Sequence, residues 1–157
     1  MILGNAEKEF KDFVEKSGIP AAWTILGLSA LPTSHDLNVG MVGMHGNYGP
    51  NILTNKCDLL IAVGMRFDDR VTGDPKTYAS QAKIIHLDID PAEINKNIIA
   101  DVPVIGDCKD SLKRITNEIE KKSHSKWISK FDDLMKIEYD KVIKSDLNPL
   151  KDGLTMG

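Results

Sequence analysis

The chain has 157 residues, of which 41% are hydrophobic and 27% are charged, and its formal net charge is −3. This length fits one ordinary domain with enough apolar material for a core, and a second full domain would not fit. The slightly acidic balance gives no general basic field, so neither nucleic acid nor an anionic membrane is an expected partner.

The sequence also indicates where the protein is located and what state its cysteines have. No apolar run approaches the roughly 20 residues needed to span a bilayer, and residues 1–10 lack the charged and apolar regions of a signal peptide, so we expect a cytoplasmic protein. Cys57 and Cys108 lie far apart, with no CxxC motif and no clustered histidine. We therefore expect two reduced structural thiols and no metal site.

A helix is the first predicted element. Residues 5–17 place Phe13 and Val14 on one helical face, and Gly18 followed by Pro20 supplies a stop signal.

Four short apolar runs follow, and they are typical of parallel strands that are covered on both faces. Each run is continuous, without polar alternation, and the last three end in Gly or Asp. They are residues 21–26, 58–64, 83–88 and 102–106. Segments 91–97 and 107–122 have helical length, and the second carries apolar residues at helical spacing. Alternating strands and helices predict an α/β fold with a Rossmann-like parallel sheet and flanking helices.

The composition changes after residue 122. Residues 127–142 form one further amphipathic pattern, and the tail after Lys144 resembles an interdomain linker. We therefore expect a sheet domain over residues 1–122, and a helix with a linker toward another domain over residues 123–157.

The residues just after each predicted strand are the candidates for a site, because open α/β sheets bind ligands there. The loop 65–73 holds two arginines and two aspartates beside a glycine. Arginine can bind a phosphate or carboxylate in a forked geometry and aspartate can orient it, although a solvated ion-pair loop is an equally good interpretation of these residues alone.

Acidic residues follow two other strands. Asp88 suits a ribose hydroxyl pair, whereas Asp90 before Pro91 suits a helix cap. Asp107 is better explained as a cap than as a ribose ligand. His45 has no histidine or cysteine near it in sequence, which favours a role in loop structure over metal binding or base catalysis.

Glycines recur every third residue between positions 40 and 49, which permits close backbone approach and leaves free amides for a phosphate. The chain contains no GxSxG, HExxH, GxxxxGK[ST] or strand-linked GxGxxG motif. The residues by themselves therefore predict an α/β domain that binds a nucleotide, without saying which one.

Three segments resemble the central domain of FAD-dependent acetolactate synthase, also called acetohydroxyacid synthase. They are residues 42–46 (VGMHG), 62–73 (AVGMRFDDRVTG) and 86–94 (HLDIDPAEI), and the resemblance runs in order over residues 2–122. The run RFDDRVTG is its most specific part.

The resemblance implies an FAD molecule extended across this domain. The implied contacts near the flavin are Thr24, Ile25, Leu26, Gly43, Met44, His45 and Gly46. The implied contacts in the loop after the strand 58–64 are Gly64, Met65, Arg66, Asp68, Arg70 and Val71. The implied contacts at the adenosine end of FAD are Asp88, Ile89, Glu93, Gly106, Asp107 and Cys108.

The same resemblance implies a reaction for the parent enzyme, which is a transferase of branched-chain amino acid biosynthesis. Pyruvate condenses with pyruvate or 2-oxobutyrate and CO2 is released, with thiamine diphosphate and Mg2+ held by other domains. Arg70 resembles the arginine that recognises the second 2-oxoacid, which its guanidinium fork makes physically reasonable. The implied partners are the thiamine-binding domains, further copies of the enzyme and a regulatory subunit.

Two departures from the family qualify these expectations. The glutamate that activates thiamine and the metal motif belong to other domains, so we expect residues 1–157 alone to be inactive. Family members also carry a strand and a glycine triplet before the segment that matches residues 1–4, so we expect a first strand to be missing, a slot in the sheet and weakened FAD binding. The alternatives are a non-catalytic FAD- or NAD-binding module and a sirtuin-like NAD-dependent domain.

Overall fold

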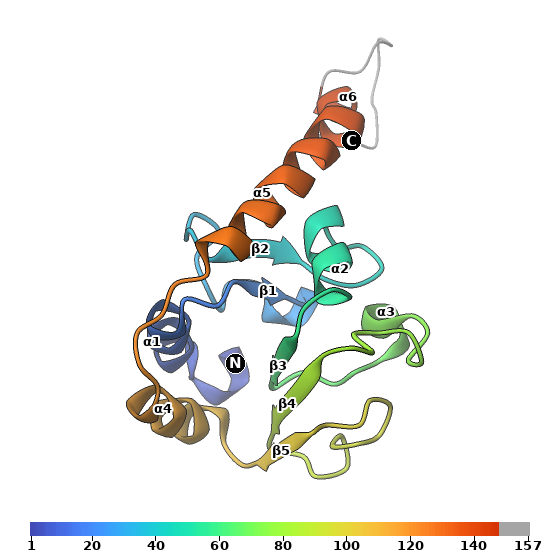
Figure 1. Ribbon diagram of the computed structural model, residues 1–157. Coiled ribbons are helices and arrows are strands. Elements are labelled where there is room, and N and C mark those ends of the chain that lie inside the picture. Colours follow the sequence, from blue (N-terminus) through green and yellow to red (C-terminus); the bar gives the residue numbers. More distant parts are fainter. Residues whose placement is uncertain (148–157) are drawn as a thin grey trace.

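The computed structural model describes residues 1–147 and shows parallel strands with helices on both sides (Figure 1). The strand β1 (Ala21–Trp23) pairs with β2 (Asn38–Met41), while β3 (Leu59–Val63) pairs with β4 (Lys83–Asp88), which pairs with β5 (Val102–Ile105). Every pair is parallel. The predicted parallel α/β fold is confirmed, with its described strands divided into two separate sheets.

Helices α1 (Glu7–Ser17) and α4 (Cys108–Glu118) cover one face of the three-stranded sheet (Figure 1). The cluster on this face centres on Leu87 and Leu112, which are both 0% exposed. Helix α1 ends at Gly18 as predicted, in a left-handed conformation with φ +67° that glycine adopts without strain. A Cβ at Gly18 would collide with the carbonyl of Lys122, so this glycine also lets the chain after α4 cross the end of α1.

A second cluster covers the opposite face of the three-stranded sheet. It contains Ala62 and Ile84 from the strands together with residues of the loops that follow them, and these are Phe67, Tyr78, Ala79, Ile98 and Ala100. Because both faces are buried, β3 and β4 need apolar residues in succession, and this explains their continuous apolar sequence.

The last helices form a rod that projects from the body of the domain (Figure 1). Helix α5 (Ser125–Glu138) packs on α2 (Tyr48–Thr54), continues through a π-helical turn at Tyr139–Ile143 and ends in α6 (Lys144–Leu147). Phe131 is the buried residue of α5. The predicted amphipathic helix is thus present. It continues through residues 145–147, where the linker was expected to begin, and the rest of that expected linker, residues 148–157, lies outside the described residues.

Two predicted elements are wrong in part or whole. The strand expected over residues 21–26 ends at Trp23, because Thr24 begins a tight turn in which its carbonyl accepts from the Gly27 amide at 2.7 Å. The helix expected over residues 91–97 is absent and replaced by turns. There Asn95 has φ +60° and its side chain accepts from the Ala100 amide, a local bond that competes with helix formation.

The structure also contains elements that the sequence pattern did not predict. These are β2, α2 and the short helix α3 (Asp69–Thr72), all within segments expected to be glycine-rich or charged loops. None of the described helices is long and apolar enough to cross a membrane.

The core packing predicts a large effect for one leucine. Leu112→Ala should lower the free energy of unfolding by about 2–5 kcal/mol, because it leaves a cavity beneath α4 at a fully buried position. Urea unfolding followed by circular dichroism measures this change. Lys113→Ala on the exposed side of the same helix is the matched control and should stay within about 0.5 kcal/mol; equal losses in both variants would contradict the packing described.

Candidate functional site

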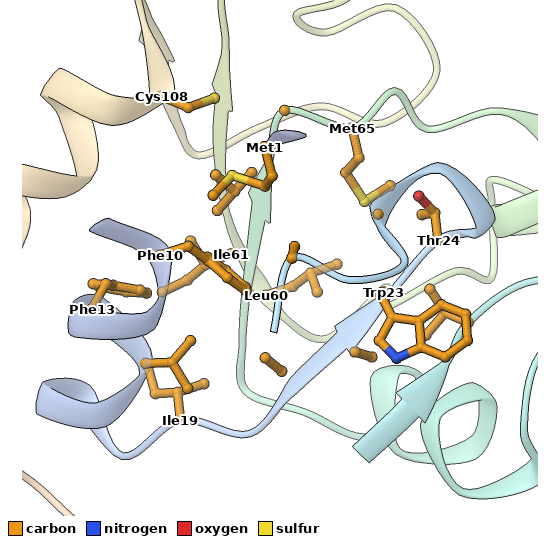
Figure 2. A pocket seen from close by; sticks show the side chains of 18 of the residues that line it. Met1, Phe10, Phe13, Ile19, Trp23, Thr24, Leu60, Ile61, Met65 and Cys108 are labelled. Atoms are coloured by element: carbon orange, nitrogen blue, oxygen red, sulfur yellow. The ribbon is translucent and has the colours of Figure 1, made fainter. Parts of the chain in front are cut away.

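The carboxyl ends of β1, β3 and β4 border an apolar cavity of about 550 Å³ (Figure 2). The predicted site residues that line it are Thr24, Leu26, Gly64, Met65, Asp88, Ile89, Asp107 and Cys108. The residues 1–4 line it as well, and the sequence carried no signal for them. The structure therefore brings together the predicted residues that follow four separate strands.

The charged loop after β3 is held by its own side chains. Arg66 Nε donates to Asp68 Oδ2 at 3.0 Å, and Asp68 Oδ1 accepts from the Arg70 amide at 3.1 Å, which caps α3. An exposed ion pair of this kind contributes at most about 1 kcal/mol to stability. Its effect is to orient the Arg66 guanidinium and to leave the exposed Arg70 side chain projecting from a fixed backbone.

The glycine loop 40–49 packs directly on this charged loop. The Met44 amide donates to the Arg70 carbonyl at 2.7 Å. A Cβ on Gly43 would lie 2.8 Å from that same carbonyl, and the φ of +105° at Gly43 suits glycine alone. At Gly46 a Cβ would lie 2.5 Å from the Met41 carbonyl. These glycines permit close approach of the protein's own backbone, and they bring Met44 beside Arg70.

Asp88 is the acidic residue at the end of β4, and it is 9% exposed. Its Oδ1 accepts from the Asp90 amide at 2.9 Å, while its Oδ2 lies 3.9 Å from His86 Nε2. Oδ2 is thus the oxygen that is more available to a ligand in the cavity. Asp90 accepts from the Ala92 amide at 2.9 Å, which is the predicted capping contact, although a turn follows instead of a helix.

Asp107 and Cys108 lie where β5 leads into α4. Asp107 caps α4 by accepting from the amides of Lys109 and Asp110, which confirms the preferred interpretation of this residue. Burial raises the pKa of the Cys108 thiol, and the carboxylates of Asp88 and Asp107 act in the same direction. Cys57 and Cys108 are both free.

The remaining predicted residues lie outside the cavity lining. Ile25 and His45 are exposed, Val71 and Gly106 are partly buried, and Glu93 pairs with Lys96 at 2.8 Å in the turn after β4. Within residues 1–147, no group of three or more His, Cys, Asp or Glu side chains is placed to hold a metal ion.

Three side chains that support the loops were missed by the sequence analysis. His86 Nε2 bonds the Met65 carbonyl at 2.9 Å, and Asn97 Nδ2 donates to the Phe67 carbonyl at 2.6 Å. Asn51 both donates to and accepts from the backbone of Gly43, at 2.9 Å in each case. Each contact joins residues that are distant in sequence or lacks a local motif, so no sequence pattern could reveal it.

The bond to Met65 decides where the proton of the His86 ring lies. A carbonyl oxygen can only accept, so Nε2 must carry the hydrogen. Nδ1 is buried and has no hydrogen-bond partner among the described residues. The ring also packs edge-on against Phe67 with centroids 5.0 Å apart. His86 therefore fixes the start of the charged loop from beneath, and it does so without reaching the cavity.

The fold and the residues around the cavity define an open parallel α/β domain whose candidate site lies in the loops at the carboxyl ends of the strands. The model of the thiamine pyrophosphate enzyme central domain matches residues 1–115, and the chain belongs to this family.

Individual relatives agree with this assignment. The chain is 43% identical over 140 residues to a probable acetolactate synthase large subunit of Methanocaldococcus jannaschii, covering 87% of this chain and 24% of the relative. It is 44% identical over 133 residues to the acetolactate synthase large subunit of Corynebacterium glutamicum, covering 82% and 21%. It is 50% identical over 109 residues to an acetolactate synthase of Mycobacterium leprae, covering 69% of this chain and 17% of the relative. The chain thus spans about a quarter or less of the length of these curated relatives.

The support from His86 is testable by hydrogen exchange. His86→Leu should speed exchange of the amides of residues 66–68, because the Met65 carbonyl loses its donor at a cost of about 1–3 kcal/mol. His86→Gln keeps an amide donor at a position like that of Nε2 and should restore much of the protection. Equal exchange in the leucine and glutamine variants would show that the histidine acts through packing alone.

Proposed function

We propose that the chain is the FAD-binding central domain of an acetolactate synthase large subunit. The similarity to acetolactate synthases of other organisms and the family match over residues 1–115 support this proposal. We assign the domain to residues 1–122 and residues 123–157 to a connection toward a further domain. The relatives favour this function over a sirtuin-like domain or a stand-alone nucleotide-binding module.

The observation that carries the FAD assignment is a set of large apolar side chains exposed at the loop edge. Ile25, Leu26, Met44 and Ile89 are 69%, 87%, 71% and 68% exposed. Exposed apolar groups beside polar ones are typical of a surface that a ligand or another domain covers. The isoalloxazine ring of a flavin is flat and largely apolar on its faces, so Ile25, Leu26 and Met44 are suitable contacts for it, while Ile89 suits the adenosine end.

Polar groups at the same edge suit the rest of the cofactor. Asp88 Oδ2 is available to accept from ribose hydroxyls, and Arg66 offers a guanidinium to the pyrophosphate. Around them we assign Gly64, Met65, Asp68, Val71, Ile89, Gly106, Asp107 and Cys108 to the adenosine and pyrophosphate parts, and Thr24 with Gly43, His45 and Gly46 to the flavin. Glu93 can take part only through its backbone or after releasing Lys96.

The proposed activity of the parent enzyme is the condensation of pyruvate with pyruvate or 2-oxobutyrate. Thiamine diphosphate, bound with Mg2+ by other domains, supplies the carbanion chemistry. We assign to this chain the recognition of the second 2-oxoacid by Arg70. Its backbone is held on one side by Asp68 and on the other by Met44, so the exposed guanidinium has a rigid base from which it can bind a substrate carboxylate. The family resemblance leads us to propose a cytoplasmic homo-oligomer with a regulatory subunit.

The FAD assignment predicts a selective titration. The purified chain should bind FAD saturably and show no comparable binding of NAD. Asp88→Ala should weaken FAD binding roughly 10- to 100-fold, because a charge-assisted hydrogen bond is lost in a partly buried site. Arg66→Ala should weaken it severalfold, since its guanidinium is exposed.

Isothermal titration measures these affinities, with Asp133→Ala on the exposed side of α5 as the control acid. Alkylation adds a second readout, because FAD should slow labelling of Cys108 more than that of Cys57, which precedes β3 at the opposite end of the cavity. Unchanged affinity in Asp88→Ala, or equal protection of both thiols, would argue against the assigned position.

The role of Arg70 is tested by grafting residues 1–122 onto the corresponding segment of the Corynebacterium glutamicum enzyme. Arg70→Ala in this chimera should raise the KM for the second 2-oxoacid at least about 10-fold, because one charged hydrogen-bond donor to the carboxylate is removed. FAD content should stay unchanged. A variant that loses its FAD and its activity together would assign Arg70 to cofactor binding instead.

A further inference from the structure

Asparagines occupy positions 47, 51 and 55, and this spacing of four residues places them along one side of helix α2. Asn47 Oδ1 accepts from the Met41 amide at 2.9 Å. Asn55 Oδ1 accepts from the Ala79 amide at 2.8 Å. Asn51 lies between them, within the helix, and also bonds the backbone of another segment. This row of amide side chains therefore ties α2 to the loops around it.

Asn51 differs from the other two because it bonds both backbone groups of one residue. Its Oδ1 accepts from the Gly43 amide and its Nδ2 donates to the Gly43 carbonyl, at 2.9 Å in each case. An amide N–H can only donate and a carbonyl can only accept, so these partners also fix which end of the Asn51 side chain carries the oxygen. Two bonds to one residue hold both the place of Gly43 and its φ of +105°.

Gly43 is the point at which the glycine loop touches the charged loop. A Cβ on Gly43 would lie 2.8 Å from the Arg70 carbonyl, and the Met44 amide, one residue further on, donates to that same carbonyl at 2.7 Å. The Arg70 amide is bonded to Asp68 Oδ1 at 3.1 Å. Both backbone groups of Arg70 thus have partners, and Asn51 places the partner of the carbonyl through Gly43.

An uncharged amide is the side chain that suits position 51. It presents one acceptor and one donor side by side, which match the N–H and C=O of a single residue. An aspartate at neutral pH would present two acceptors, and one of them would face the Gly43 carbonyl and repel it. A protonated aspartate regains one donor and one acceptor. Aspartate at this position would therefore break the contact when it is ionised and restore it when it is neutral.

We propose that Asn51 is a positioning residue for the second 2-oxoacid. By fixing Gly43 it holds the Met44 amide on the Arg70 carbonyl, and it thereby sets the place from which the Arg70 guanidinium reaches the substrate. Asn51 acts through these residues and does not bind the substrate itself. This role in substrate binding rests on the proposed function of Arg70, whereas the hold on the loop depends only on the hydrogen bonds of Asn51 and Met44.

Hydrogen exchange in the purified chain tests the hold on the loop. In Asn51→Asp at about pH 7 the carboxylate is ionised, so the Met44 amide should exchange at least about 10-fold faster than in the wild-type chain. Pairing with the Gly43 carbonyl favours the neutral carboxyl and raises its pKa, so the excess exchange should shrink as the pH is lowered toward about 4.5. Wild-type chain measured at each pH accounts for the intrinsic pH dependence of exchange and for the other titrating groups.

Two variants are the controls for this measurement. Asn51→Ala removes both bonds without adding a titratable group, so its excess exchange over wild type should be the same at both pH values. Asn55→Asp makes the same chemical change about one helical turn further on, where the partner is Ala79, and should leave exchange at Met44 within about twofold of wild type. Exchange in Asn51→Asp equal to that of wild type at about pH 7, or an excess that low pH does not reduce, would overturn the proposal.

The chimera that carries residues 1–122 in the Corynebacterium glutamicum enzyme tests the role in substrate binding. Asn51→Asp should raise the KM for 2-oxobutyrate about three- to tenfold and change kcat less, because the Arg70 side chain then starts from a less fixed backbone. FAD content should stay unchanged, and Asn55→Asp should behave like the unmodified chimera. A fall in kcat together with loss of FAD would mean a general loss of structure and would overturn the positioning role.

A double-mutant cycle in the same chimera shows whether Asn51 acts through Arg70. In the Arg70→Ala background, Asn51→Asp should add little to the KM, because the guanidinium that it positions is gone. Equal effects of Asn51→Asp with and without Arg70 would overturn the proposed route. If Arg70→Ala raises the KM and Asn51→Asp does not, the role of Asn51 alone is refuted. If neither change affects the KM, the assigned role of Arg70 fails as well, so the two failures are distinguishable.

Discussion

The parallel register of β3 against β4 is the constraint on which the rest of the structure depends. Five consecutive pairs, from Leu59 opposite Lys83 to Val63 opposite Leu87, make the two strands end at the same level. The loop that carries Arg66 and the carboxylate of Asp88 therefore leave the sheet side by side. Because both faces are buried, a shift of one residue would move core side chains to the wrong face, so apolar packing and the position of the candidate site are set together.

Much of the fold could be predicted because its signals are local. Continuous apolar runs marked β3, β4 and β5, and single residues marked helix ends, as with Gly18 after α1 and Asp107 before α4. The strand β2, with sequence NVGM, contains a glycine and no long apolar run, so its extended form depends on pairing with β1. The apolar residues Ile25 and Leu26 led to a predicted strand that is too long, because exposed apolar residues cannot be told from buried ones in the sequence.

The candidate site also has parts that the sequence predicted and parts that it did not. The charged loop after β3 and the acidic residue after β4 were recognisable, because ligands of parallel sheets bind at carboxyl ends and the family resemblance covers these segments. The contact of Met44 with the Arg70 carbonyl could not be recognised from the sequence, and neither could the hydrogen bonds from His86 and Asn97. Each depends on how distant segments fold together. The ligand roles of the individual residues stay predictions until binding is measured.

The rod made by α5, its π-helical turn and α6 has a mechanical consequence. It is held to the body of the domain as far as Glu138, whose carboxylate accepts from Asn47 Nδ2 at 3.4 Å, and it extends from there to Leu147, a distance of roughly 14 Å at about 1.5 Å per residue. A tilt of about 10° at Glu138 would therefore displace the tip of the rod by about 2 Å. Helix α5 rests on α2, whose first residues, Tyr48 and Gly49, belong to the glycine loop. A small adjustment of that loop would thus also change the direction of the rod.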